Sequence, residues 1–237
     1  MKFYLTLLLT FLVEARILET DEQVVQRVCE GKLSFITLDL GNVASGKKTN
    51  PFVEENNVKL CRELTESEIF STMTMKRDDA PEDVLSPDAT QYSSARINDI
   101  SSILKAPSFY DGFSLKISSL DEAHVGRLFA EIPEKTEVAL DLEFKLWKKV
   151  KNLIKQHQKK IKFVVLRIPY DKFRRNTLKL IYKYHPMTAL SVIAAPGKLS
   201  FIELATGLKK IHPRKKILFS LTTKLEYGFE YYRTKEV

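Results

Sequence analysis

Short apolar runs alternate with longer amphipathic stretches along this chain, and this alternation restricts the fold more than any other feature. The runs are rich in β-branched and aromatic side chains, and a turn former or a proline follows most of them, which is typical of buried strands. The last five runs begin roughly 24 to 28 residues apart, as strands do in βα units. The predicted strands are Leu33–Leu40, Ile69–Met75, Gly112–Ile117, Glu137–Phe144, Ile161–Ile168, Ala189–Ala195 and Lys216–Leu221. The predicted helices are Val58–Leu64, Tyr92–Leu104, Asp121–Ile132, Leu146–His157, Phe173–Tyr184 and Leu199–Ile211.

Strands that alternate with helices in this way predict a parallel α/β sheet, which either closes into a barrel or stays open. The sequence lacks the fingerprints G-x-G-x-x-G and G-x-x-x-x-G-K-[ST] of nucleotide-binding open sheets. We therefore expect a (β/α)8-type barrel, reduced or incomplete, and keep an open doubly wound parallel sheet as the alternative. The sequence does not place an eighth strand, because Gln23–Cys29 fits either a strand or a helix.

The first residues of the chain have the three parts of a secretory signal peptide. A basic start at Lys2 precedes the apolar run Phe3–Val13, and a small residue follows at Ala15. This run is too short for a membrane span, which needs roughly twenty residues, and no later segment is long enough either. We predict cleavage after Ala15, secretion to the extracellular space, no transmembrane span, and a single barrel-like domain over residues 16–237.

The two cysteines are interpreted in the light of that compartment. Cys29 and Cys61 are the only cysteines of the chain, and an oxidising compartment favours a disulfide between them. Two separate buried thiols are the alternative. Neither cysteine has a histidine or another cysteine at the spacing of metal ligands, so we expect no metal site, and no motif predicts a cofactor.

Charge is distributed unevenly along the chain. Residues 145–237 hold 23 Lys and Arg against 5 Asp and Glu, whereas residues 1–144 hold 15 against 25. A basic half suggests an anionic partner, which in a secreted protein is a glycosaminoglycan, a phospholipid surface or an acidic glycan rather than nucleic acid. Four lysines along one stretch are spaced as on a helical face, which suits a polyanion, although it also suits an ordinary solvated face. These lysines are Lys148, Lys151, Lys155 and Lys159.

Carboxylates at strand ends are the candidates for chemistry, because the reacting groups of a barrel lie at the carboxyl ends of its strands. Asp141 and Glu143 are two residues apart on one predicted strand, so their side chains share a face with Ala139. The larger apolar residues of that strand suit packing against helices, which would turn the carboxylates inward. Two neighbouring carboxylates can act as acid and base in glycoside chemistry. Aromatic residues near the C-terminus, by contrast, suit packing more than stacking on a ligand; they are Tyr227, Phe229, Tyr231 and Tyr232.

Two segments of the chain resemble family-18 glycoside hydrolases, the chitinases. The segment from Ser94 through Asp111-Gly112-Phe-Ser114 resembles the approach to that family's active-site strand, where D-G-x-D-x-D-x-E follows a helix with an arginine. The segment from Gly207 to Leu221 resembles the family's late helix and its following K-I-x-x-G-[IL]-P strand. The resemblance covers most of residues 30–230 and implies a barrel, but its motifs are degenerate.

The departures from the motif concern the catalytic residues themselves. Asp111 and Gly112 match its first two positions, whereas Ser114, Lys116 and Ser118 stand where the family has two aspartates and the catalytic glutamate. In the family that glutamate is the general acid, and the aspartate before it orients the substrate's N-acetyl group. The resemblance therefore implies a chitinase-like protein that has lost its acid motif and binds a glycan, such as a chitin-like or N-acetylated oligosaccharide, or a protein partner.

Two further interpretations stay open. A second alignment places Asp141 and Glu143 on the last two acidic positions of the motif. This arrangement is also similar to family-25 lysozymes, where D-x-E ends a central strand and an aspartate, here Asp39, lies on the first strand. It implies a small active glycosidase. The remaining interpretation is a secreted basic protein that binds polyanions.

Overall fold

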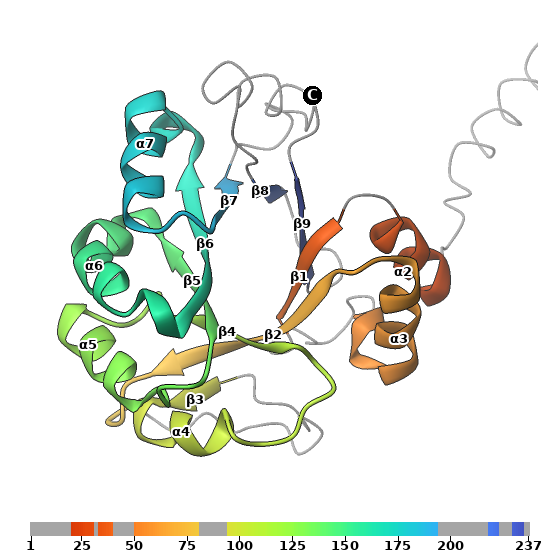
Figure 1. Cartoon of the computed structure of the whole chain (residues 1–237), viewed down its shortest axis with the longest axis horizontal. Helices are drawn as coiled ribbons and strands as arrows, with labels where there is room; N and C mark the ends of the chain where they lie inside the picture. The colour runs from red at the N-terminus through yellow and green to blue at the C-terminus, as the bar shows by residue number, and fades with distance from the viewer. Residues whose placement is uncertain are drawn as a thin grey trace, which may run out of the picture.

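The computed structural model describes residues 20–30, 33–39, 50–80, 94–193, 218–222 and 229–234 (Figure 1). The predicted signal peptide with its cleavage site after Ala15 lies outside these residues, as does the predicted helix Leu199–Ile211.

The described strands form one sheet that closes on itself. Its strand order is β1–β9–β8–β7–β6–β5–β4–β2–β3, and β1 also pairs in parallel with β2, so that the first and the next-to-last strands of this order meet. The result is the barrel in Figure 1, which confirms the predicted (β/α) barrel and excludes the open sheet. The strands are β1 (Leu33–Asp39), β2 (Glu68–Lys76), β3 (Ser94–Arg96), β4 (Gly112–Lys116), β5 (Val138–Glu143), β6 (Ile161–Pro169), β7 (Thr188–Ile193), β8 (Leu218–Thr222) and β9 (Phe229–Thr234).

The strand that completes the barrel is β9, for which the sequence had given no position. It runs antiparallel to both β8 and β1, whereas the other pairings in the described sheet are parallel. Six residues separate β8 from β9, too few for the helical crossover that a parallel strand requires. The chain therefore returns antiparallel to β8.

Helices lie outside the barrel, on the side of the sheet away from its axis (Figure 1). The segment Gln23–Cys29 belongs to a helix, whose first residues are held by a capping box between Thr20 and Gln23. The predicted helix Tyr92–Leu104 is wrong at Ser94–Arg96, because these residues pair with the end of β2 as a short strand. The α-helices are α2 (Asp21–Cys29), α3 (Glu55–Leu64), α4 (Ile100–Ile103), α5 (Glu122–Glu131), α6 (Phe144–Gln156) and α7 (Arg175–Tyr184); the 3-10 helices are η2 (Pro51–Val53), η3 (Ile97–Asp99), η4 (Gln158–Lys160) and η5 (Tyr170–Lys172).

Aromatic rings fill the interior of the barrel. The ring of Phe35 on β1 stacks on Tyr232 of β9 at 4.5 Å between centroids and lies 4.0 Å from Phe163 of β6. Such ring pairs stabilise the core beyond the area that they bury. Tyr232 is thus a core residue and Tyr231 is half-buried, whereas Tyr227 and the side chain of Phe229 lie outside the described part of the chain. The interior cluster consists of Phe35, Phe70, Ala139, Phe163, Val165, Ala189 and Tyr232.

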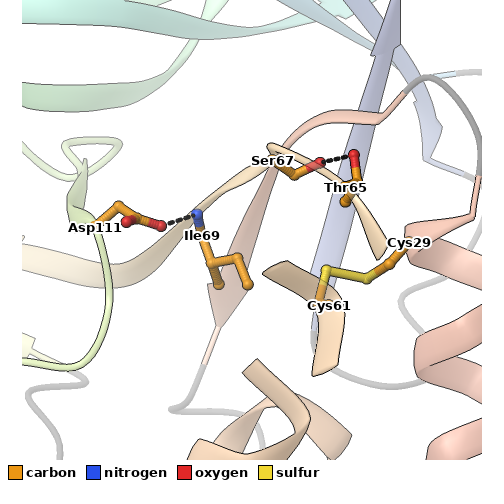
Figure 2. The surroundings of a disulfide bond; sticks show 6 residues. All are labelled: Cys29, Cys61, Thr65, Ser67, Ile69 and Asp111. Atoms are coloured by element: carbon orange, nitrogen blue, oxygen red, sulfur yellow. Dashed lines mark hydrogen bonds between the residues drawn. A yellow bond between two sulfur atoms is a disulfide. The ribbon is translucent and has the colours of Figure 1, made fainter. Parts of the chain in front are cut away.

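A second apolar layer lies between the barrel and its helices. Trp147 of α6 is fully buried in the part that covers β4 to β7. A smaller cluster lies between β1, β2 and the helix pair α2–α3, and it includes both cysteines. A disulfide joins Cys29 of α2 to Cys61 of α3, as predicted, and so fastens these two helices to each other (Figure 2).

Candidate functional site at the carboxyl end of the barrel

The predicted alternation of β5 determines where its carboxylates lie. Val138, Leu140 and Leu142 pack in the layer under the helices, and Ala139 belongs to the interior cluster. Asp141 follows Ala139 on the interior side and is 1% exposed, because the barrel closes around it. Glu143 ends the strand and is exposed at the carboxyl end of the barrel. The strand thus directs one buried and one exposed carboxylate toward the end at which barrels place their sites.

Asp141 is held by an arginine of the neighbouring strand. Arg167 of β6 donates from Nε to Oδ1 at 2.8 Å and from Nη2 to Oδ2 at 2.6 Å, so both carboxylate oxygens accept from one guanidinium. Paired, charge-assisted bonds of this kind compensate for much of the cost of burying two charges. Because its oxygens are engaged in this way, Asp141 is not presented to a ligand as a free nucleophile or base.

The positions that correspond to the chitinase motif lie next to this pair. In the β4–β5 register Ser114 stands opposite Ala139, and Lys116 stands opposite Asp141, so both side chains belong to the interior face. Ser114 is fully buried, and its Oγ has no hydrogen-bond partner within the described structure. Ser118 lies in the turn after β4 and is exposed. The structure therefore brings Ser114 and Lys116 to the candidate site and leaves Ser118 at its periphery.

The first two motif positions lie at the other end of β4. Asp111 accepts the backbone N–H of Ile69 at Oδ2 over 2.7 Å (Figure 2). It also accepts an Arg62 N–H at Oδ1 over 3.1 Å, so it fastens the start of β4 to both β2 and α3. A Cβ on Gly112 would lie 3.1 Å from the ring of Phe70, so glycine at this position makes room for an interior aromatic side chain. Both residues have structural roles, at the amino end of the barrel.

The buried pair belongs to a larger polar layer that follows the aromatic interior cluster toward the carboxyl end. Its other members are serine and threonine side chains on strands β1, β2, β4 and β7, each at most 5% exposed. Each of them lies on the inward face of its strand, the face that the residues of the interior cluster share. We use the name polar layer for Thr37, Thr72, Ser114, Asp141, Arg167 and Ser191.

Four members of the polar layer were not identified as candidates from the sequence: Thr37, Thr72, Arg167 and Ser191. The sequence pattern that could have identified them is period-two alternation, since each lies two residues after an interior Phe, Val or Ala of its own strand. Asp39 is the last residue of β1 and pairs with Thr72 through the backbone, but its side chain lies outside the described part of the chain.

The predicted basic residues lie away from this end, along the outer surface of α6 and η4. Lys148, Lys155 and Lys159 are exposed. Lys151 is half-buried, because its Nζ lies 5.3 Å from the ring centre of Tyr184 on α7. These lysines therefore form a separate surface from the polar layer.

The described residues lack two kinds of site. No group of three His, Cys, Asp or Glu side chains there could hold a metal ion. Within those same ranges, no helix has both the length and the apolar character to cross a bilayer. Comparison of the chain with models of known families, with curated proteins and with solved structures gave no match.

Proposed function

We propose that this chain is a secreted, non-catalytic barrel of the chitinase-like kind, which binds a glycan at the carboxyl end of its barrel through the polar layer. The residues at the acidic positions of the resembled motifs support it most directly. The arginine of the next strand occupies both oxygens of Asp141, and Ser114 and Lys116 stand where the resembled family has carboxylates.

A glycan fits the chemistry of this layer. The hydroxyl groups of a glycan both donate and accept hydrogen bonds. Three members of the polar layer, Thr37, Thr72 and Ser191, have hydroxyls that complement such groups. Ser114 adds a buried hydroxyl without a protein partner in the described structure. A buried hydroxyl that lacks a partner costs free energy, and a ligand that supplies the partner recovers part of that cost.

The secreted state is supported by the disulfide between Cys29 and Cys61, because such bonds persist in oxidising compartments. The signal peptide remains a prediction from the sequence.

Titration calorimetry with chitin oligosaccharides, run beside a turnover assay on the same oligosaccharides and on peptidoglycan, tests the proposal. We expect binding without turnover. The variant Ser114→Ala removes the hydroxyl with little change in side-chain volume, and we expect it to weaken binding by about tenfold, the factor that a lost hydrogen bond to a buried group predicts. Circular dichroism verifies that the variant is folded.

The exposed carboxylate provides the matched control. We expect Glu143→Gln to leave binding within about twofold of the unmodified protein, since this side chain lies outside the buried layer. Turnover that disappears in Glu143→Gln would overturn the proposal and identify an active glycosidase. Absence of both binding and turnover in a folded, disulfide-closed sample would overturn it as well.

A further inference from the structure

The outer surface of α6 and α7 is basic and contains no acidic residue. Neither helix has an Asp or a Glu in its sequence. From residue 144 to residue 193 the chain has 14 Lys and Arg but a single acid, Asp171, which pairs with Lys172. The positive charge of these two helices is therefore not neutralised by side chains of the same helices.

Some basic residues of this region have structural roles. Lys160 donates to the backbone oxygens of Phe129 and Ile132 at the end of α5, and Lys162 pairs with Glu68 at the amino end of the barrel. Nine others are exposed on α6, on η4, and at the start and along the outer side of α7. We use the name basic surface for Lys145, Lys148, Lys149, Lys155, Lys159, Arg174, Arg175, Lys179 and Lys183.

The start of α7 shows that this charge opposes helix stability. The N-terminus of a helix is the positive end of its dipole, so acidic residues stabilise its first turn and basic residues destabilise it. Helices α2, α3 and α5 obey this rule, with Glu22, Glu55 and Glu122 in their first turns. Helix α7 breaks it, since Arg175 stands in its first turn without an acid and its N-cap residue is Arg174. Helix α6 has Lys145 in its first turn, although its N-cap residue is Glu143. A local rule broken at the start of α7 points to a function for the charge.

The basic side chains are arranged in rows. Arg175, Lys179 and Lys183 follow one another at intervals of four residues, which places them on one side of α7 over about 12 Å. Lys148 and Lys155 lie about 10 Å apart along α6, on the side where Lys151 reaches Tyr184 of α7. The two helices pack side by side on the barrel (Figure 1), so the two rows lie on adjacent helices.

We propose that the basic surface binds a sulfated polysaccharide of the glycosaminoglycan type, which lies across α6 and α7. A linear polymer with repeated anionic groups can contact both rows at once, and rows of point charges match such repeats. The surface is poorly suited to insertion into a lipid bilayer, because Leu180 is the one exposed large apolar side chain on these two helices. This inference is independent of the proposed glycan site, which lies at the carboxyl end of the barrel.

Heparin affinity measured as a function of salt tests the inference. We expect the protein to bind a heparin-derived oligosaccharide, and its affinity to fall steeply with salt, because the contacts are between exposed charges. Two triple variants remove the rows separately: Lys148→Gln, Lys155→Gln, Lys159→Gln on one side, and Arg175→Gln, Lys179→Gln, Lys183→Gln on the other. We expect each to lower the affinity by at least about tenfold at physiological salt.

The matched control removes the same number of charges elsewhere. Lys59, Lys105 and Lys135 are exposed on other parts of the described surface, and their combined change to Gln should alter the affinity by less than about twofold. An equal loss in this control would show an effect of net charge alone and overturn the proposal. Failure to bind heparin would overturn it too, as would tighter binding to a short DNA duplex or to phosphatidylserine-containing vesicles than to heparin.

Discussion

Arg167 and Asp141 form a two-point ion pair between adjacent strands at the centre of the polar layer. Asp141 is almost fully buried, whereas the Arg167 side chain is 19% exposed, so the pair lies at the boundary between the barrel interior and its carboxyl end. This arrangement restrains the carboxylate and neutralises its charge. The pair therefore decides both how stable the layer is and what chemistry it can offer.

Removal of the arginine should destabilise the fold strongly. In Arg167→Gln the buried carboxylate of Asp141 loses its charged partner, and an uncompensated buried charge costs about 3 kcal/mol or more in the free energy of unfolding. The double variant Asp141→Asn with Arg167→Gln removes both charges and should recover most of this loss. Urea unfolding of the three proteins measures the difference.

An exposed ion pair of the same chemistry provides the control for this experiment. Arg77 pairs with Asp79 through 2.6 Å and 2.9 Å contacts at the surface, where water screens the charges. Arg77→Gln should therefore leave the free energy of unfolding almost unchanged. If Arg167→Gln were equally mild, Asp141 would not depend on its partner, and a free carboxylate would be available at the site.

The disulfide should contribute measurably to stability. Cys29 and Cys61 enclose a loop of 32 residues, for which the chain-entropy model predicts roughly 3–4 kcal/mol. We expect Cys29→Ala with Cys61→Ala to lower the free energy of unfolding by that amount, and reduction of the unmodified protein to give a similar loss. Alanine is chosen because both positions are fully buried. A thiol that reacts with a labelling reagent in the folded, unreduced protein would contradict the bond.

The seven predicted strands are all present, with ends displaced by at most two residues, because buried parallel strands produce continuous apolar runs. Strand β9 was missed for a physical reason. Its aromatic residues indicated only that the segment packs, and no short-range signal showed that it returns antiparallel between β8 and β1. The three residues of β3 are too few to show any period.

The candidate site was only partly predictable. Alternation along β5 placed Asp141 on the inward face with Ala139, since that inference needs a single strand. Its partner Arg167 is 26 residues further along, and their contact depends on the register between two strands, which the sequence does not specify. The resemblance to chitinases directed attention to Asp111, which the structure uses to fasten β4 to β2.

Stability should fall as the solution is acidified, in part through His185. This side chain is buried between α7 and β7, and desolvation lowers its pKa below 6.5, although a backbone contact to Ile161 opposes the shift. The folded protein thus keeps His185 neutral, while the unfolded chain binds a proton as the pH falls below about 6.5. The stabilising contribution is complete above that pH and decreases below it, until the folded-state pKa is reached.

The variant His185→Gln isolates this contribution. Glutamine does not titrate, so we expect its free energy of unfolding to change less between pH 7 and pH 5 than that of the unmodified protein, whatever its absolute stability. The pH dependence of a His157 variant can be compared with that of His185→Gln. His157 is less buried and stacks on Phe129, and desolvation again lowers its pKa. A variant His185→Gln with the same pH dependence as the unmodified protein would contradict the assignment.

At the start of α7, replacing a basic residue by an acid should stabilise the protein and weaken the proposed heparin binding. Arg175 adds positive charge to the positive end of the helix dipole, and the preceding residue, Arg174, provides no side-chain cap. Arg175→Glu should raise the free energy of unfolding by about 0.3–1 kcal/mol and weaken heparin binding at the same time. Lys183→Glu makes the same change of charge at the other end of the helix, where a cation is favourable, and should lower both quantities. Thermal unfolding and heparin chromatography of the two variants separate the effects. If Arg175→Glu also destabilised the protein, Arg175 would be needed for folding, and the argument that its charge serves binding at the expense of stability would fail.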